Sequence, residues 1–570
     1  MISFKNVSFK YPGSDSWVLK DVSVTITQGE FVGIIGGNGA GKSTFCKGMN
    51  GLIPFYYVGD LEGEITINGM NTVEANVGQL SKHVAYVYQD FENQLVRPTV
   101  MDEVIFSPLN YGHADYKERG LEALEILGLS DLANEYIWQL SGGQKHLVAL
   151  AGALSLNPDI IIIDEPVAQL DPAHAISLYD KLKMLNEKHG KTIIVIEHHT
   201  EFVANYCNEV ILLEQGSVKW KKPVTEALNS VEELSERDIF PPQVTVAAHH
   251  LIGELNVRLP ITIEEAKKEF TYLKGLTTHS QAIQSLNPKG EVIVKLEDVE
   301  YGYKSLTRKM KNVLNGLTIN LHEGERIALV GSNGAGKSTL LKLISGIIKP
   351  FRGSVTTDGL LTKKTSPEII AEKVAFIYQK PEEMFIEDSI KKDVSHYLDA
   401  RKAENRQTFI DEVMEQFNLS DLSTRDGRLL SGGQQRRTSL AIGMAMKPRI
   451  MLMDEPTSSL DMATRKEMMK LLGHLDEDVK TTVVATHDMQ LVAEWATRVI
   501  VMNEGKVLAD LPPRILFSSP ELLQQASLVE PQIVSLCHEL EISPVALSID
   551  EFITKARPFK ERGEKCEWIS

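Results

Sequence analysis

Two glycine-rich segments hold the residues whose types and spacing point most directly to chemistry. They read Gly36-Gly37-Asn38-Gly39-Ala40-Gly41-Lys42-Ser43-Thr44 and Gly331-Ser332-Asn333-Gly334-Ala335-Gly336-Lys337-Ser338-Thr339. Each follows a short apolar run and precedes helix-like sequence, so backbone N–H groups and a helix N-terminus would surround a bound anion. The spacing predicts that each lysine reaches the β- and γ-phosphates of ATP and that Ser43 and Ser338 offer hydroxyls to Mg²⁺.

Two pairs of neighbouring acids are placed to act on the same phosphates. Asp164-Glu165 follows the apolar run Ile160–Ile163, and Asp454-Glu455 follows Ile450–Met453. A strand that ends in Asp164 or Asp454 would hold Mg²⁺, often through water. Glu165 and Glu455 would then polarise the attacking water. Such pairs are commonly only solvated strand ends, but their place downstream of a phosphate-binding loop favours the catalytic interpretation.

The whole arrangement occurs twice along the chain. Leu140-Ser141-Gly142-Gly143-Gln144 returns as Leu430-Ser431-Gly432-Gly433-Gln434, and the acidic pairs return in the same order. The period is far longer than that of a solenoid repeat, so each copy is a domain. We expect a first domain over 1–230, an appendage and linker over 231–290, a second domain over 291–512 and a C-terminal appendage over 513–570.

The elements that must position these residues alternate between strand and helix. Glu30–Ile35 and Glu325–Val330 enter the glycine-rich loops, and Thr192–Ile196 and Thr481–Ala485 are further apolar runs. This alternation indicates α/β domains with largely parallel sheets. Segments that begin with Pro-Gln pairs, at Pro242 and Pro531, suggest that a helical appendage follows each domain. Glu264–Lys274 is predicted as a helix of the linker, which ends in a polar run at Pro288-Lys289-Gly290.

The sequence Leu-Ser-Gly-Gly-Gln, together with the other motifs, resembles the ABC transporter ATPase family over both domains. The resemblance implies two tandem P-loop ATPase domains of α/β fold, each with a helical subdomain and a C-terminal helical appendage. In that family two domains pair head to tail. Ser141, Gly143 and Gln144 would contact the ATP held by Lys337, and Ser431, Gly433 and Gln434 would contact the ATP held by Lys42.

Other positions match the family one by one. Tyr11 and Tyr303 fall where an aromatic ring stacks on adenine. Gln89 and Gln379 match the glutamine that senses Mg²⁺ and the attacking water, so the implied metal set is Ser43, Gln89, Asp164, Ser338, Gln379 and Asp454. His198 and His487 match the histidine near the γ-phosphate, and they join Glu165 and Glu455 as candidate catalytic residues. Asp171 and Asp461 match a loop aspartate at the domain interface.

Both copies keep the lysine, acids, glutamine and histidine, so the sequence predicts two hydrolytic sites. The first copy nevertheless departs from the second in three places. It has Lys145-His146 for Gln435-Arg436, Ala168-Gln169 for Ser458-Ser459, and His199 for Asp488. These differences concern mainly the site built from Lys337 and the first Leu-Ser-Gly-Gly-Gln segment.

Composition narrows the possible partners. The 60 basic and 77 acidic residues give a formal charge of −17, which disfavours general nucleic-acid binding. The four scattered cysteines give no metal or disulfide framework and fit a reducing cytosol. No apolar run approaches the ~20 residues that cross a bilayer. If the protein acts at a membrane, another chain must span it.

The strings around the glutamines resemble the energy-coupling factor importer branch of the family. They are Tyr88-Gln89-Asp90-Phe91-Glu92-Asn93-Gln94-Leu95 with Pro98-Thr99-Val100, and more weakly Tyr378-Gln379 with Pro381-Glu382-Glu383. The resemblance implies a peripheral protein on the cytoplasmic face of the membrane. Its partners would be a polytopic membrane coupling protein and a small membrane substrate-binding protein, with one copy of this chain per complex. The cargo would be a vitamin, a vitamin precursor or a transition-metal ion.

Two alternatives stay open at the level of sequence. Some tandem ABC ATPases without membrane spans work on ribosomes, but these commonly carry basic surface and a highly charged linker helix. Tandem sugar-importer ATPases are the other alternative, although their second half often loses catalytic residues, whereas Glu455 is present here. The acids Asp90, Glu92, Glu382 and Glu383 are expected to meet basic residues of a membrane partner.

Overall fold

A computed structural model describes residues 2–167, 170–253, 257–277, 290–304, 310–400, 406–458, 460–475 and 479–563. Residue contacts divide the chain into two compact units, 1–269 and 270–570. Each unit holds one complete set of the motifs. The loop residues Ala168, Gln169 and Ser459 and the linker residues Pro288 and Lys289 lie outside the described residues.

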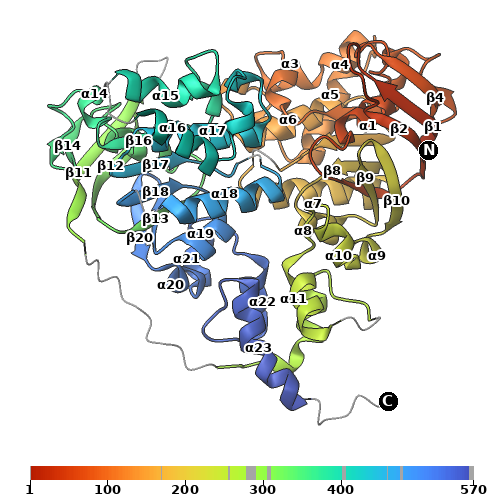
Figure 1. Ribbon diagram of the computed structural model, residues 1–570. Helices are drawn as coiled ribbons and strands as arrows, with labels where there is room; N and C mark the ends of the chain where they lie inside the picture. The colour runs from red at the N-terminus through yellow and green to blue at the C-terminus, as the bar shows by residue number, and fades with distance from the viewer. Residues whose placement is uncertain are drawn as a thin grey trace. The chain divides into compact units, whose positions relative to one another are not determined.

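The first unit is built around a six-stranded sheet (Figure 1). Its strand order is β10-β9-β3-β8-β7-β6, and every neighbouring pair is parallel except β9 with β10. The strands are β3 (Phe31–Ile35), β6 (Val84–Val87), β7 (Ile160–Asp164), β8 (Thr192–Ile196), β9 (Glu209–Glu214) and β10 (Ser217–Pro223). The carboxyl ends of the parallel strands meet at one edge, where ligands of open α/β sheets bind.

A second, antiparallel sheet lies in the same unit, and the sequence patterns did not predict it. Its order is β2-β1-β4-β5, with β1 (Ile2–Lys10), β2 (Leu19–Ile26), β4 (Asp60–Ile67) and β5 (Met70–Asn71). Phe4, Val7 and Ile65 of this sheet pack with Phe45 of α1 (Lys42–Met49) against one face of the parallel sheet. The domain is therefore mixed rather than largely parallel.

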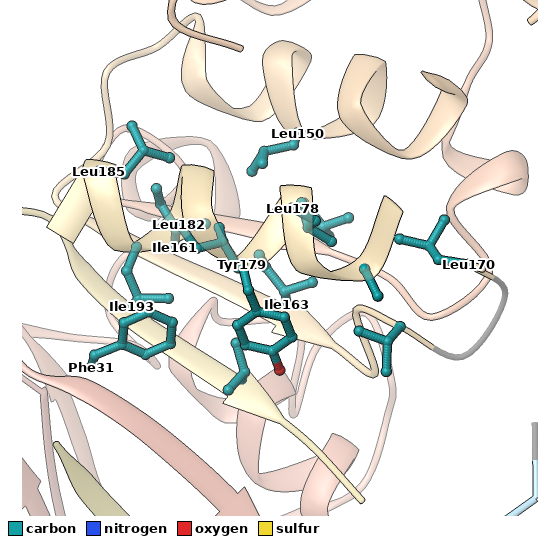
Figure 2. Close-up of a cluster of buried hydrophobic side chains, with 14 of the residues drawn as sticks. Phe31, Leu150, Ile161, Ile163, Leu170, Leu178, Tyr179, Leu182, Leu185 and Ile193 are labelled. Carbon is teal, nitrogen blue, oxygen red and sulfur yellow. The ribbon is translucent and has the colours of Figure 1, made fainter. Parts of the chain in front are cut away.

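The opposite face of the parallel sheet is covered by helices (Figure 2). Leu178, Tyr179 and Leu182 of α7 (Pro172–His189) point at Phe31 of β3 and at the isoleucines of β7 and β8. Strands that are buried on both faces read as continuous apolar runs, which is why Ile160–Ile163 shows no alternation. This packing fixes the strand ends that carry Asp164 and Glu165.

Short helices between β6 and β7 form a helical subdomain. They are α3 (Val100–Val104), α4 (Phe106–Asn110), α5 (Tyr116–Leu127) and α6 (Gly142–Leu154), with 3₁₀ turns η1 (Phe91–Gln94), η2 (Ser130–Leu132) and η3 (Ile137–Gln139). Helices α3, α5 and α6 contact one another, and they gather as a group in Figure 1. Before the appendage, the unit also contains α2 (Val77–Leu80), α8 (Thr200–Tyr206), α9 (Val224–Asn229) and α10 (Val231–Ser235).

The second unit repeats the same plan. Its mixed sheet has the order β16-β17-β18-β13-β19-β20, and its antiparallel sheet has the order β12-β11-β14-β15. The strands are β11 (Val292–Lys304), β12 (Met310–His322), β13 (Arg326–Val330), β14 (Arg352–Thr357), β15 (Leu360–Leu361), β16 (Val374–Ile377), β17 (Ile450–Asp454), β18 (Thr481–Ala485), β19 (Arg498–Asn503) and β20 (Lys506–Leu511). The duplication inferred from the motifs thus extends to both sheets.

The helices of the second unit correspond to those of the first. They are α13 (Lys337–Ile344), α14 (Pro367–Ile370), α15 (Ile390–Ala400), α16 (Arg406–Gln416), α17 (Gly432–Ala445), α18 (Met462–His474), α19 (Met489–Trp495), α20 (Pro513–Phe517) and α21 (Pro520–Gln525), with η5 (Pro381–Met384), η6 (Ser420–Leu422) and η7 (Gly427–Leu429). The connection from α13 to β14 is shorter than that from α1 to β4, which agrees with the longer loop of the first copy between Gly51 and Gly63.

Each unit also carries a helical appendage of the same design. In the first, α11 (Gln243–Ile252) precedes α12 (Ile263–Glu269), and in the second α22 (Gln532–Glu539) precedes α23 (Ile549–Gly563). Glu265 accepts the Ile261 N–H at 2.8 Å, and Glu551 accepts the Leu547 N–H at 2.9 Å. The second helices of the two appendages therefore share their helix-start chemistry, and the first helices, α11 and α22, both follow an N-cap proline of the paired Pro-Gln segments.

The linker helix is shorter than predicted. The expected helix Glu264–Lys274 ends at Glu269, and a separate 3₁₀ turn, η4 (Thr271–Leu273), follows. Phe270 is fully buried, with its ring centroid 5.6 Å from that of Phe552 in α23. This burial turns the chain out of the helix and joins it to the C-terminal appendage within the second unit.

The packing of α7 yields a stability prediction. Leu182→Ala should lower the unfolding free energy of the first unit by about 2–5 kcal/mol, because it opens a cavity beside the sheet where Leu182 is fully buried. Thermal and denaturant unfolding of the full chain would measure it. Leu121→Ala in α5, where the side chain is 51% exposed, is the matched control. Equal effects of both changes would contradict the proposed role of α7.

Candidate functional site

Both glycine-rich loops have the form of a phosphate cradle. Loop 36–41 joins β3 to α1, and loop 331–336 joins β13 to α13. Lys42 is buried, and its Nζ donates to the carbonyls of Gly36 and Gly37 at 2.8 and 3.1 Å. Lys337 makes the same bonds to Gly331 and Ser332 at 2.7 and 3.2 Å. Each ammonium is thus held inside its loop, at the start of a helix.

Glycine is required at the start of each loop for lack of space. A Cβ on Gly36 would stand 2.4 Å from the carbonyl oxygen of Leu213, and one on Gly331 would stand 2.1 Å from that of Met502. Both glycines also have positive φ, 156° and 146°. The backbone therefore runs directly against the end of β9 or β19.

The first carboxylate of each acidic pair lies next to its loop serine. Burial raises the pKa of Asp164, while hydrogen bonds from Ser43 and Tyr86 and the charge of Lys42 act to lower it. Burial likewise raises the pKa of Asp454, opposed by Ser338 and Lys337. A raised pKa means that ionisation is costly without a cation, so both carboxylates suit a site that is completed by a positive charge.

The donor set of the first site fits Mg²⁺. The Tyr86 hydroxyl donates to Asp164 Oδ2 at 3.0 Å, whereas the buried Asp164 Oδ1 has no partner within hydrogen-bonding geometry. A serine hydroxyl and a carboxylate with an open oxygen are the hard ligands that Mg²⁺ prefers. Ser43 and Asp164 would hold the ion here, and Ser338 and Asp454 would hold it in the second unit. The ion would neutralise charge on the phosphates of bound ATP.

The second acid of each pair has an unusual backbone. Glu165 and Glu455 have φ of 50° and 48°, in the left-handed region that non-glycine residues rarely adopt. Their N–H groups still donate to the neighbouring strand, to Ile196 and Ala485 at 3.1 and 2.9 Å. Strain of this kind commonly occurs at functional sites. It turns each carboxylate out of the sheet at the strand end.

In the first unit the predicted catalytic side chains are in direct contact. Gln89 Nε2 donates to Glu165 Oε2 at 2.6 Å, and His198 Nε2 lies 3.2 Å from Glu165 Oε1. Gln89 follows β6, Glu165 follows β7 and His198 follows β8. Three adjacent strands thus deliver one amide, one carboxylate and one imidazole to a single point beside the phosphate loop.

The second unit assembles two of the three. His487 Nδ1 lies 2.9 Å from Glu455 Oε2. Burial would lower the pKa of His487, but the charge and hydrogen bond of Glu455, with help from Asp488, outweigh burial and raise it. Among the described residues, no hydrogen bond joins Gln379 to Glu455. The histidine also uses Nδ1 here, whereas His198 uses Nε2.

The predicted adenine platforms lie at the phosphate loops. The Tyr11 hydroxyl is 3.1 Å from Thr44 Oγ1, and the Tyr303 hydroxyl is 3.4 Å from Thr339 Oγ1. Tyr303 is 46% exposed, so its ring has a face open to a ligand. The positions agree with a stacking role next to the triphosphate.

Both Leu-Ser-Gly-Gly-Gln segments begin a helix. Ser141 is the N-cap of α6, and Ser431 is the N-cap of α17. Each serine forms a capping box with Gln144 or Gln434, so these glutamine side chains serve their own helix start. The backbone N–H groups and the positive helix end are then available for an anion.

The second glycine of each segment lies against the helix that begins at the loop aspartate. A Cβ on Gly143 would lie 2.8 Å from the ring of His174, and one on Gly433 would lie 2.6 Å from Thr464. His174 and Thr464 are bonded to Asp171 and Asp461, the N-caps of α7 and α18. Helices α6 and α17 begin at the Leu-Ser-Gly-Gly-Gln signature segments and are called the signature helices. Each therefore packs against the start of the helix that follows the acidic pair.

Sequence reasoning missed three buried residues around the first site. Tyr86 contacts Asp164, and Tyr179 donates to Glu197 at 2.7 Å. The second copy has Phe376, Met469 and Thr486 at these positions. A residue-by-residue comparison of the two copies, rather than of their motifs alone, would have revealed all three.

The geometry predicts that both sites hydrolyse ATP. Glu165→Gln and Glu455→Gln, made separately, should each lower steady-state ATPase activity, because loss of a general base costs about 10²–10⁴-fold at its own site. Phosphate release by the purified chain measures the rate, and ATP binding by each variant is the control. Full activity in either variant would show that only one site works.

The protein-family model described as ABC transporter matches residues 19–168 and 314–458. An ABC transporter ATP-binding protein of Caldanaerobacter subterraneus is 32% identical over 97% of this chain and 98% of its own length. One of Streptococcus mutans is 32% identical over 96% of this chain and 97% of its own.

A solved structure supports the fold over nearly the whole length. The complex of archaeal ribosomal stalk protein aP1 with the ribosome recycling factor aABCE1 aligns with a TM-score of 0.57, 22% identity and coverage of 91% of this chain and 92% of that one. At this identity the likeness shows a shared tandem fold. With two matched family segments, two complete phosphate loops and full-length relatives, the chain belongs to the ABC transporter family as a tandem ATP-binding ATPase.

Proposed function

We propose that this chain is the ATPase of an importer of the energy-coupling factor type. It would bind a polytopic membrane coupling protein on the cytoplasmic face of the membrane, and a small membrane protein would supply the vitamin, vitamin precursor or transition-metal ion. One copy would suffice, because it holds both ATPase domains. Among the described residues, no helix is long and apolar enough to span a bilayer.

The observation that carries the proposal is a matched pair of exposed apolar residues beside the glutamine loops, which are the segments that follow β6 and β16 and contain Gln89 and Gln379. Val96 follows η1 in the first unit and is 63% exposed, and Ile386 follows η5 in the second and is 67% exposed. They occupy equivalent positions in the two copies. Large apolar side chains that stay in water at the same place in both domains favour a binding surface for another protein.

In the first unit the longer loop after α1 adds to this apolar surface. Phe55, Tyr56 and Val58 are all more than half exposed. Burial raises the pKa of Tyr88, and the nearby hydroxyls of Tyr57 and Tyr56 raise it further. This loop therefore lies close to the residue that precedes Gln89. A partner helix at the first glutamine loop would therefore meet aromatic as well as aliphatic side chains.

Two of the acids that were expected to meet basic residues of a membrane partner already interact with basic residues of this chain. Glu92 forms an ion pair with Lys145 of α6 at 2.6 Å. Glu382 acts electrostatically on Arg436 of α17. These acids are partly engaged with the signature helices, so apolar contact is the stronger basis for docking.

Hydrolysis would follow from the side chains assembled at each strand end. The lysine and the helix N-terminus would hold the phosphates, and Glu165 or Glu455 would orient and polarise water for in-line attack on the γ-phosphate. His198 or His487 would steady that carboxylate. The roles carried over from the family, including contact of the signature residues with ATP, form part of this proposal.

The glutamine loops are the natural route from hydrolysis to transport. Gln89 bonds to Glu165 on one side and is followed by the exposed segment around Val96 on the other. A partner that moves this segment would change the position of the glutamine at the catalytic carboxylate. By linkage, ATP would then bias the position of the partner.

The proposal predicts which membrane proteins travel with the chain. A tagged chain purified from detergent-solubilised native cells should recover one or two small polytopic membrane proteins. The double change Val96→Asp and Ile386→Asp should abolish that recovery while ATP binding is retained. Leu508→Asp is the control, because Leu508 is also exposed but lies on β20, at the sheet edge opposite β16. Recovery of ribosomes without membrane proteins would overturn the proposal.

A further inference from the structure

The two units anchor their catalytic histidines by different means. In the second unit Asp488, next to His487, accepts the Leu491 N–H at 2.9 Å and forms an ion pair with Arg465 of α18. Thr457 donates to the same carboxylate at 3.1 Å. A permanent cation therefore neutralises the acid that holds this loop.

Every member of that network is replaced in the first unit. His199, Ala175 and Val167 stand at the positions of Asp488, Arg465 and Thr457. The loop keeps an acid, but one position before the histidine instead of one after it, as Glu197 in place of Thr486. These differences between the two units all fall in one hydrogen-bond network and are not scattered over the domain.

Glu197 makes its own set of bonds. Its Oε1 accepts the N–H groups of His198 and His199, both at 2.9 Å, and its Oε2 accepts the Tyr179 hydroxyl at 2.7 Å. Glu197 is 2% exposed and Tyr179 is fully buried. Tyr179 extends from α7 toward the sheet, with its hydroxyl beyond the apolar cluster (Figure 2).

We propose that Glu197 is a positioning residue of the first ATP site, which holds the backbone that presents His198 to Glu165 and makes hydrolysis at this site depend on the protonation of a buried acid. The proposal rests on the assignment of Glu165 and His198 to ATP hydrolysis. In the second unit Thr486, at the position of Glu197, accepts the Asp488 N–H through its hydroxyl oxygen at 3.0 Å, and the ion pair of Asp488 with Arg465 braces the same loop.

The surroundings of Glu197 explain the dependence on pH. Its titratable neighbours are Tyr179 of α7, Cys207 at the end of α8, and His198 and His199 on its own loop. Of these four, only the two histidines can become cations. Burial raises the pKa of Glu197 to about 7, although the bonds from His199, Tyr179 and His198 act to lower it. The pKa of Asp488, by contrast, is lowered despite burial, because Arg465 faces it.

The direction of the effect follows from the hydrogen bonds. An ionised carboxylate is the stronger acceptor for the two N–H groups, so the loop is held best at high pH. As pH falls through the pKa of Glu197, the proton weakens these bonds and the histidine is less well placed. Hydrolysis at the first site should therefore rise with pH through the neutral range, whereas Asp488 stays ionised there.

The experiment isolates each site in the full chain. In the Glu455→Gln background, single-turnover hydrolysis of ATP reports the first site, and in the Glu165→Gln background it reports the second. Glu197→Gln should remove the rise with pH in the first case. Glu197→Ala should slow that site by about 10- to 100-fold, as expected when a catalytic group is displaced. Tyr179→Phe should shift the midpoint to higher pH, because it removes a donor that favours the charged form.

A graft separates positioning from mere support of the fold. Val167→Thr, Ala175→Arg, Glu197→Thr and His199→Asp together transfer the network of the second unit to the first. The graft should restore hydrolysis at the first site relative to Glu197→Ala. The rate should no longer show the rise with pH that ionisation of Glu197 causes. An unchanged pH profile in Glu197→Gln would overturn the proposal, as would a Glu197→Ala variant that only melts earlier. Full hydrolysis in a variant with both Glu165→Gln and Glu455→Gln would instead count against the catalytic assignment.

Discussion

The turn that ends β7 and β17 is the feature on which each site depends. The residue at this turn, Glu165 or Glu455, still donates its N–H to the neighbouring strand, but its positive φ turns the chain out of the sheet. This pairing lets a strand buried on both faces end in a carboxylate that leaves the sheet and meets the histidine of the next strand. Glycine would adopt the backbone more easily but has no side chain, so the strain is accepted where the glutamate is needed. The helices packed on the sheet hold the turn in place.

Charge balance is the second condition. Lys42 and Asp164, like Lys337 and Asp454, are buried groups of opposite sign beside one helix start. Neither carboxylate is fully neutralised by its lysine, since burial still raises the pKa of both. The unit is thus organised for ligands that bring both negative phosphates and a divalent cation. Gly36 and Gly331 cannot be replaced for a steric reason, because a side chain would push the loop and its N–H groups away from the phosphates.

Much of this could be predicted from the sequence. Motif spacing gave the strands at the phosphate loops and acids almost to the residue, since buried strands between helices are continuous apolar runs. The antiparallel sheet was missed because its strands alternate irregularly, with shifts in register at Phe4, Val7 and Phe9. The linker helix was predicted too long because helical periodicity cannot show that Phe270 packs on Phe552. The resemblance placed Gln89 and Gln379 at Mg²⁺ and the attacking water, but the bond from Gln89 to Glu165, and the lack of one between the described Gln379 and Glu455, had no signal in the sequence.

Duplication explains how the two sites can share chemistry and differ in support. The residues proposed to act at ATP are the same in both units: a lysine at the phosphates, a serine and an aspartate at Mg²⁺, and a glutamate at the attacking water. The residues one step away need only fix the loop, and a buried acid can do so with a cation, as Asp488 does, or with hydroxyl and backbone donors, as Glu197 does. The second solution leaves the acid sensitive to protons, because no permanent charge opposes its burial. On this proposal the two domains perform the same reaction, but the loops that carry His198 and His487 respond differently to pH.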